Sequence, residues 1–136
     1  MSLEERTCLV TGASRGIGAG IARDLGARGA EVVVNYRSSD DEAQAVHDDI
    51  EDGPGSAVLA QADVSDIEAV EEMHQTAHDA FGRVDVLVNN AGVTVDRTFE
   101  NMTREDWQWV IDVNLGGTVH CTSVCYAAIR AAEEGR

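Results

Sequence analysis

The sequence predicts an α/β fold, a doubly wound parallel sheet with helices on both faces, and two observations predict it. Short apolar, β-branched runs alternate with helical patterns from residue 7 to residue 89, which is typical of parallel strands joined by right-handed crossovers. The first run also passes through a glycine-rich turn directly into a helical pattern, and α/β folds build phosphate-binding turns in this way. At 136 residues we expect a single domain, residues 1–136, with strand order 3-2-1-4.

The expected strands are four short apolar runs: residues 7–11, 31–36, 57–61 and 84–89. The first two are T-C-L-V-T and E-V-V-V-N-Y. Their apolar residues are nearly continuous rather than alternating, as in strands that are buried on both faces. The third run is set off from the preceding helix by Gly53-Pro54-Gly55, because neither residue type continues a helix.

Three helices are expected between these strands, at residues 16–28, 40–52 and 66–81. Apolar residues recur in them at helical spacing, and Gly29 ends the first. Ser38 or Ser39, followed by acids three residues on, can cap the second helix. Ser65 with Glu68 has the spacing of a capping box for the third.

Beyond Gly92 the pattern becomes wholly helical. Thr103 and Asp106 can form a capping box, and Trp109 can be exposed or at an interface. The last helix, 115–133, is apolar nearly all round, so we expect it to be buried on more than one side. Four residues of the capped helix are expected to face inward: Trp107, Val110, Ile111 and Asn114. Of these, Trp107 is expected in the core.

The stretch from Thr7 to Gly18, T-C-L-V-T-G-A-S-R-G-I-G, carries the clearest chemistry. The first turn of a helix has unpaired N–H groups and a partial positive charge, so it attracts phosphate. Glycine lets the backbone approach closely and adopts positive φ freely. The alternative is a tight turn with no ligand. The residues expected to form this phosphate site are Gly12, Ser14, Arg15, Gly16, Ile17 and Gly18.

The charge is strongly acidic: 25 acids oppose 10 bases, all of them arginine, for a net charge of −15. This disfavours binding to nucleic acid or to an anionic membrane. We expect this protein to work in a salt-adapted cytoplasm. Its unfolding midpoint should then rise between low and molar KCl, because salt screens the repulsion among its acidic side chains. No run is long enough to span a membrane and no signal peptide is visible.

Cys8, Cys121 and Cys125 are expected to be reduced core thiols.

Two further motifs follow the glycine pattern T-G-x-x-x-G-x-G: Asn89-Asn90-Ala91-Gly92, and Asn114 in V-N-L-G-G-T. In this order they resemble the short-chain dehydrogenase/reductase family, in particular its 3-oxoacyl-(acyl-carrier-protein) reductase-like members. The resemblance covers essentially the whole chain and only the N-terminal half of the family pattern. It implies an NAD(P)-binding Rossmann-type domain and hydride transfer between nicotinamide and a ketone, a 3-oxoacyl group or a secondary alcohol.

The resemblance also assigns roles to residues. Asp63 and Val64 are expected at the adenine edge, with the aspartate accepting from the exocyclic amine. Asn90, Ala91 and Gly92 are expected beside the adenosine ribose, and Asn89 is expected to hold the end of the sheet together. Asn114 is similar to the family's active-site asparagine, which holds a water in the proton relay. Without the family, an inward asparagine is more simply explained as satisfying backbone groups.

Cofactor choice is expected at the end of the second strand. An NAD site has an acid about 20 residues past the glycines, whereas an NADP site has a base nearby. Here the segment is Asn35-Tyr36-Arg37-Ser38, with no acid before Asp40. Arg37 and Arg15 can clamp a 2′-phosphate, so NADP(H) is expected and NAD is the alternative. Both arginines could instead be ordinary surface residues.

The family's catalytic serine and Tyr-x-x-x-Lys pair have no counterpart here, since the chain has no lysine and neither Tyr36 nor Tyr126 precedes one. We therefore weigh a cofactor-binding piece of a reductase, cut after the helix that follows the asparagine motif, against a non-enzymatic nucleotide-binding or oligomerising protein. An unrecognised acid among these residues is a third possibility. The family implies a homo-oligomer through helix 115–133. His74 and His78 are expected on an exposed helix face, with no metal.

Overall fold

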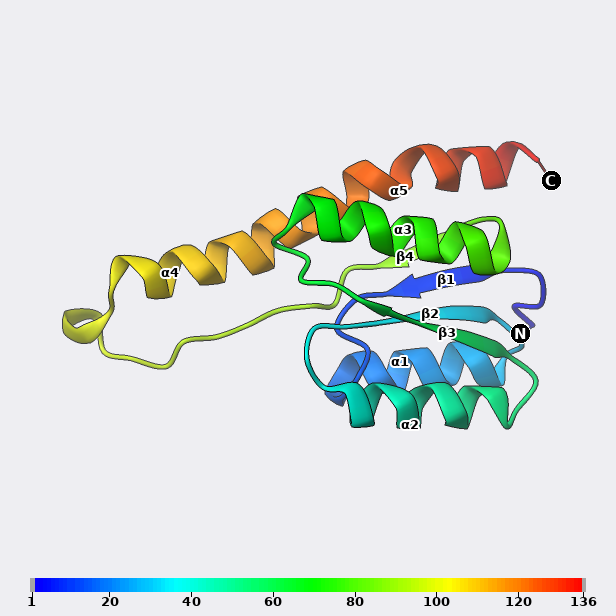
Figure 1. Cartoon of the computed structure of the whole chain (residues 1–136), viewed down its shortest axis with the longest axis horizontal. Coiled ribbons are helices and arrows are strands. Elements are labelled where there is room, and N and C mark those ends of the chain that lie inside the picture. The colour runs from blue at the N-terminus through cyan, green and yellow to red at the C-terminus, as the bar shows by residue number, and fades with distance from the viewer. Residues whose placement is uncertain (1, 136) are drawn as a thin grey trace.

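The computed structural model describes residues 2–135. Helices cover both faces of one sheet, with α1 and α2 on one side and α3 and α5 on the other (Figure 1). The strands are β1 (Thr7–Val10), β2 (Glu31–Tyr36), β3 (Ser56–Gln61) and β4 (Val86–Val88). The helices are α1 (Gly16–Ala27), α2 (Asp40–Glu51), α3 (Ile67–Phe81), α4 (Arg104–Ile111) and α5 (Gly117–Glu134), with a 3-10 turn at Phe99–Asn101 and a π-helical turn at Asp112–Gly116.

The sheet is parallel throughout and its order is β3-β2-β1-β4, which confirms the expected doubly wound, Rossmann-type α/β fold. Successive residues of β2 serve the two faces in turn. Val33 packs in the core under α3 and α5, while Val32 and Val34 pack in the core over α1 and α2. Because both faces are covered, the apolar run is continuous, as the sequence indicated.

Two of the expected helix caps are different in the structure. Asp66, not Ser65, is the N-cap of α3, and its side chain accepts from the backbone N–H of Glu68. Ser65 is not available because its hydroxyl donates to Asp63 Oδ1 at 2.7 Å. Ser39 precedes α2 without a capping hydrogen bond from its side chain.

The expected capping box of Thr103 and Asp106 is present at the start of α4. The helix then continues through the π-helical turn into α5 without a break. α4 extends away from the sheet (Figure 1), so none of its residues is fully buried. The placement of Trp107 in the core is therefore wrong, since it is 47% exposed. Trp109 instead packs against the core under α3 and α5.

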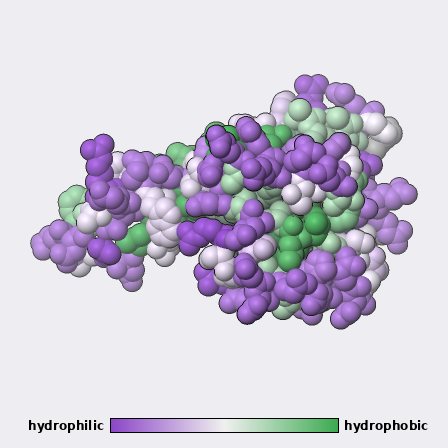
Figure 2. Space-filling model, viewed as in Figure 1, coloured by the Kyte–Doolittle hydropathy of each residue, from purple (hydrophilic) through white to green (hydrophobic). Residues whose placement is uncertain are grey.

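Helix α5 is covered on one face only in this chain. Cys121 and Cys125 are buried toward α3 and the sheet, whereas Leu115, Val119 and Tyr126 are exposed. Within the described chain only one side is covered, and burial of the other side by a partner subunit stays a prediction. Hydrophilic residues cover most of the face shown in Figure 2, and apolar residues reach it in separate patches.

All three cysteines are free and buried, as expected. Burial raises the pKa of Cys121 to about 12, and that of Cys125 to about 11. Burial, reinforced by the charge of Asp85, raises the pKa of Cys8 to about 11. The thiols are therefore protonated and unreactive at neutral pH. Among the helices of residues 2–135, none is both long and apolar enough to cross a membrane.

Candidate functional site

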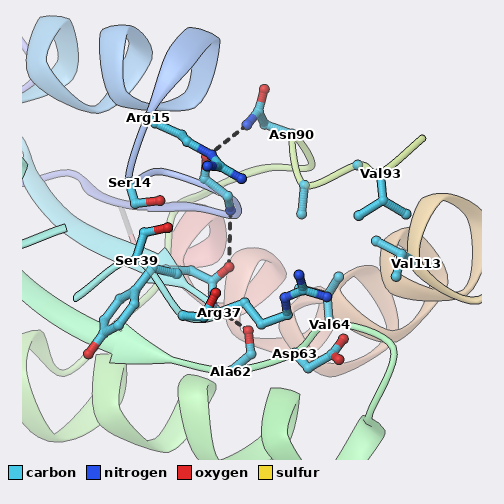
Figure 3. A pocket seen from close by; sticks show the side chains of 16 residues that line it. Ser14, Arg15, Arg37, Ser39, Ala62, Asp63, Val64, Asn90, Val93 and Val113 are labelled. Carbon is cyan, nitrogen blue, oxygen red and sulfur yellow. Dashed lines mark hydrogen bonds between the residues drawn. The ribbon is translucent and has the colours of Figure 1, made fainter. Parts of the chain in front are cut away.

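A cavity of about 270 Å³ opens at the carboxyl ends of the strands (Figure 3). In open α/β sheets ligands bind at this edge. Of the residues predicted to bind a cofactor, nine line the cavity, and they come from all four strand ends: Gly12, Ser14, Arg15, Arg37, Asp63, Val64, Asn90, Ala91 and Gly92. Gly16, Ile17, Gly18 and Asn114 lie outside this lining, although the first three open α1 directly after the turn that forms one wall.

The glycines at positions 12, 16 and 18 are required for two reasons, a left-handed backbone and close packing. Gly12 and Gly16 have φ of 60° and 58°, the left-handed region that favours glycine. A Cβ on Gly16 would meet nothing within 4 Å, so the space in front of it is open. A Cβ on Gly18 would collide with the carbonyl of Gly12 and the amide of Asn90. Ile17 beside them is 78% exposed.

The N-terminus of α1 follows this turn and carries no acidic residue in its first turn. Its positive end is therefore not neutralised by the helix itself. Arg15 is the N-cap residue, in extended conformation and without a capping hydrogen bond from its side chain. Together with the open space in front of Gly16, this end of the helix suits an anionic phosphate group.

Asn35 at the end of β2 binds the glycine turn through hydrogen bonds of its side chain. This role was not predicted from the sequence. It is 2% exposed. Its Oδ1 accepts from the Gly12 N–H at 3.0 Å, and its Nδ2 donates to the carbonyls of Ala60 and Ala62 at 3.1 and 3.3 Å. A buried amide satisfied on both sides fixes the turn against the ends of two strands. The available signal was a single polar residue within the apolar run of β2.

Thr11 and Asn90 tie the turn to the end of β4. The Thr11 hydroxyl donates to the carbonyl of Val88 at 3.3 Å and accepts from the N–H groups of Asn90 and Ala91, both at 2.9 Å. The Asn90 amide donates to the carbonyls of Thr11 and Gly12, both at 3.1 Å. The Asn90 side chain thus shapes the glycine turn as well as lining the cavity.

Asn89 and the Asp63–Val64 segment are held by other contacts. The Asn89 amide donates to Thr122 Oγ1 at 3.2 Å, which joins the end of β4 to α5. Asp63 Oδ1 accepts from the N–H and hydroxyl of Ser65 at 3.0 and 2.7 Å. The Val64 carbonyl lies 2.9 Å from His120 Nδ1 on α5. The loop that carries Asp63 and Val64, the pair predicted at the adenine edge, is therefore fixed in place by these hydrogen bonds.

Two arginines at the cavity have no carboxylate partner among the described residues. Of the nine arginines that the structure describes, six form ion pairs with carboxylates, and Arg15, Arg37 and Arg104 do not. Figure 3 shows the Arg37 side chain extended across the cavity. Its guanidinium carbon lies 5.4 Å from the centroid of the Trp109 ring, within the range of a cation–π contact.

Asn114 lies in the π-helical turn and binds the backbone of Val93. Its Oδ1 accepts from the Val93 N–H at 2.8 Å, and its Nδ2 donates to the Val93 carbonyl at 3.0 Å. This is the backbone-satisfying role that an asparagine commonly plays. π-helical turns are also frequent at functional sites. The catalytic role of Asn114 stays a prediction.

The two histidines on α3 differ in exposure. His78 is exposed as expected, but His74 is half-buried and its Nε2 is buried without a hydrogen-bond partner in the described chain. Burial, with a smaller effect from His78, lowers the pKa of His74. Within residues 2–135 no group of three potential metal ligands comes together.

Comparison with known proteins places these features in context. A 3-oxoacyl-[acyl-carrier-protein] reductase from Synechocystis is 44% identical over 135 residues, which is 99% of this chain and 55% of the reductase. A 3beta-hydroxysteroid dehydrogenase 1 from Eggerthella lenta is 46% identical over 85% of this chain and 44% of its own length. The chain therefore spans about half the length of these relatives.

Solved structures agree in fold. A short chain dehydrogenase from Burkholderia cenocepacia in complex with NADP superposes with a TM-score of 0.91 at 36% identity, over 95% of this chain and 53% of that one. A short chain dehydrogenase from Mycobacterium avium gives 0.89 at 35% identity, over 99% and 51%. The family model described as short chain dehydrogenase matches residues 6–136. This chain accordingly belongs to the short-chain dehydrogenase family.

Proposed function

We propose that this chain supplies the cofactor-binding part of an NADP(H)-dependent oxidoreductase. The observation that carries the proposal is the pair Arg15 and Arg37, which line the cavity without carboxylate partners among the described residues of a protein with 25 acids. Because these two arginines lie together at one cavity without carboxylate partners, their charge is available to an anionic ligand there. The relative in complex with NADP supports this choice of cofactor.

The residues of the cavity and of the adjoining start of α1 suit the adenosine and phosphate groups of such a cofactor. The N-terminus of α1 and the open space before Gly16 would take the pyrophosphate. Arg37 would take the 2′-phosphate with the in-plane N–H groups of its guanidinium. Asp63 would accept from the adenine amine, and Asn90, Ala91 and Gly92 would line the adenosine ribose.

The bound nicotinamide would supply hydride chemistry toward a carbonyl or secondary alcohol. This substrate class is supported by the names of the relatives, a 3-oxoacyl-[acyl-carrier-protein] reductase and a 3beta-hydroxysteroid dehydrogenase. In the proposal Asn114 fixes the backbone at Val93 and contributes a polar group to proton transfer. We place the protein in the cytoplasm and propose a homo-oligomer through the exposed face of α5.

A nucleotide-binding or oligomerising role without catalysis is the second candidate. It is favoured by the exposed apolar residues of α5, Val119 and Tyr126, which suit contact with another subunit. Turnover of a ketone by the full-length protein separates the two candidates. Cofactor binding without turnover would support the second.

The cofactor assignment is tested by titrating NADPH and NADH into the wild-type protein and the Arg37→Asp variant. Because a charge-assisted hydrogen bond is worth about 1.5–3 kcal/mol, NADPH affinity should fall roughly 10- to 100-fold. NADH affinity should change little. Arg104→Asp is the matched control, since Arg104 has no ion pair in the described chain and lies outside the cavity. NADPH affinity unchanged in Arg37→Asp would contradict the proposal.

A further inference from the structure

Trp109 contacts Arg37, which lines the cavity. It lies on α4, 72 positions along the chain from Arg37, and does not line the cavity itself. Its ring packs against the core under α3 and α5, so its position is fixed by the fold. The guanidinium carbon of Arg37 lies 5.4 Å from the ring centroid.

We propose that Trp109 is a positioning residue for cofactor choice: its ring holds the Arg37 guanidinium at the cavity, so that α4 helps to set the preference for a 2′-phosphorylated nucleotide. The inference rests on the proposed NADP(H) function. It adds a residue outside the cavity lining to the set that decides between the two nicotinamide cofactors.

The geometry of a guanidinium makes this arrangement productive. A cation–π contact uses the flat face of the group, whereas all five N–H donors lie in its plane. An arginine stacked on a ring therefore keeps its donors available for a bidentate bond to phosphate. Stacking also removes rotamer freedom that would otherwise be lost when the phosphate binds.

The backbone of Arg37 is fixed independently of the ring. Its carbonyl accepts from Gln61 Nε2 at 3.0 Å, which ties the end of β2 to the end of β3. Trp109 therefore restricts the conformations of the Arg37 side chain and not those of its backbone.

Acidic residues follow Arg37 in the sequence and line the same cavity. Asp63 lines the cavity, and Asp40, Asp41 and Glu42 open α2 directly after the Arg37 loop. Arg37 nevertheless forms no ion pair within the described chain and contacts the ring instead. Without the ring, a neighbouring carboxylate could draw the side chain away from a phosphate and weaken its binding.

The test compares adenosine 2′,5′-bisphosphate with 5′-AMP as calorimetric ligands of the full-length protein at one salt concentration. The ratio of their affinities isolates the 2′-phosphate. Trp109→Leu should reduce this ratio roughly 3- to 10-fold, the range of a cation–π contact. Affinity for 5′-AMP should stay unchanged. Trp109→Phe should retain part of the ratio, and Trp109→Met, which keeps apolar bulk without a ring, should lose it like leucine.

Trp107→Leu is the matched control, because Trp107 lies two residues away and is 47% exposed; its ratio should equal that of the wild type. In an Arg37→Gln background, Trp109→Leu should have no further effect.

Three results would overturn the inference. A ratio lost in Arg37→Gln but kept in Trp109→Leu and Trp109→Met would overturn it and leave the proposed function standing. Equal losses for both ligands would show that Trp109 only supports the fold. A wild-type protein that binds 5′-AMP without preferring the bisphosphate would overturn the NADP(H) assignment and the inference together.

Discussion

The sheet with α1, α2 and α3 differs from the helical arm formed by α4, the π-helical turn and α5 in how well each buries its apolar residues. The sheet region encloses two core clusters, one on each face. Of the nine large apolar side chains exposed in the described chain, six lie between Phe99 and Tyr126. The sheet region therefore buries apolar residues on both faces, one of them together with Val113, Cys121 and Cys125 of the arm, whereas the opposite face of the arm stays uncovered in the described chain.

Core truncation should give the largest contrast between the two regions. Leu9 of β1 is fully buried, whereas Leu115 in the π-helical turn of the arm is 59% exposed. Leu9→Ala should lower the free energy of unfolding by about 2–5 kcal/mol. Leu115→Ala should change it by only about 0.5 kcal/mol. Urea unfolding of both variants measures this. A comparable loss for Leu115→Ala in the full-length protein would mean that the arm is covered there.

Two glycines of α1 sharpen the contrast between close packing and open surface within the sheet region. Gly18→Ala should cost about 1–3 kcal/mol and weaken cofactor binding, because the new methyl group collides with the Gly12 carbonyl and the Asn90 amide. Gly20→Ala meets nothing within 4 Å and should stabilise the helix by up to about 1 kcal/mol. Thermal unfolding with and without NADPH tests both. Equal behaviour of the two variants would contradict the geometry.

The smallest effect concerns His74, which lies on α3 beside the arm. Its pKa is lowered in the folded protein, chiefly by burial. The unfolded chain therefore binds the proton more tightly, and stability falls as the pH drops below the unfolded pKa of about 6.5. The unfolding midpoint should fall less for His74→Gln than for the wild type between about pH 7.5 and about pH 5. Parallel pH profiles would exclude a contribution from His74.

Local spacing was sufficient to predict the sheet order and the glycine turn. It was not sufficient for α4, where helical spacing identifies an apolar stripe but not its partner. Because α4 extends off the sheet, Trp107 is exposed and Trp109 packs inward, the reverse of the expected order. The cap of α3 was misassigned because Asp63 takes the hydroxyl of Ser65.

The site shows the same division. Arg15, Arg37 and the glycines were found because each stands within a few residues of a recognisable strand end. The hydrogen bonds of Asn35 join residues 23 to 27 positions apart, and the contact between Arg37 and Trp109 spans 72. Contacts of this kind depend on how β2, β3 and α4 are assembled, so no local pattern could reveal them.

The π-helical turn at Asp112–Gly116 sets the rotational phase between α4 and α5. One residue of helix corresponds to about 100° of rotation, so an added or deleted residue here would swing α4 around its axis. α5 could not follow, because Gly117 is pressed against the Val64 side chain too closely to admit a methyl group. A single-residue deletion in this turn would thus point Trp109 away from Arg37 while leaving the sheet and its glycine turn intact.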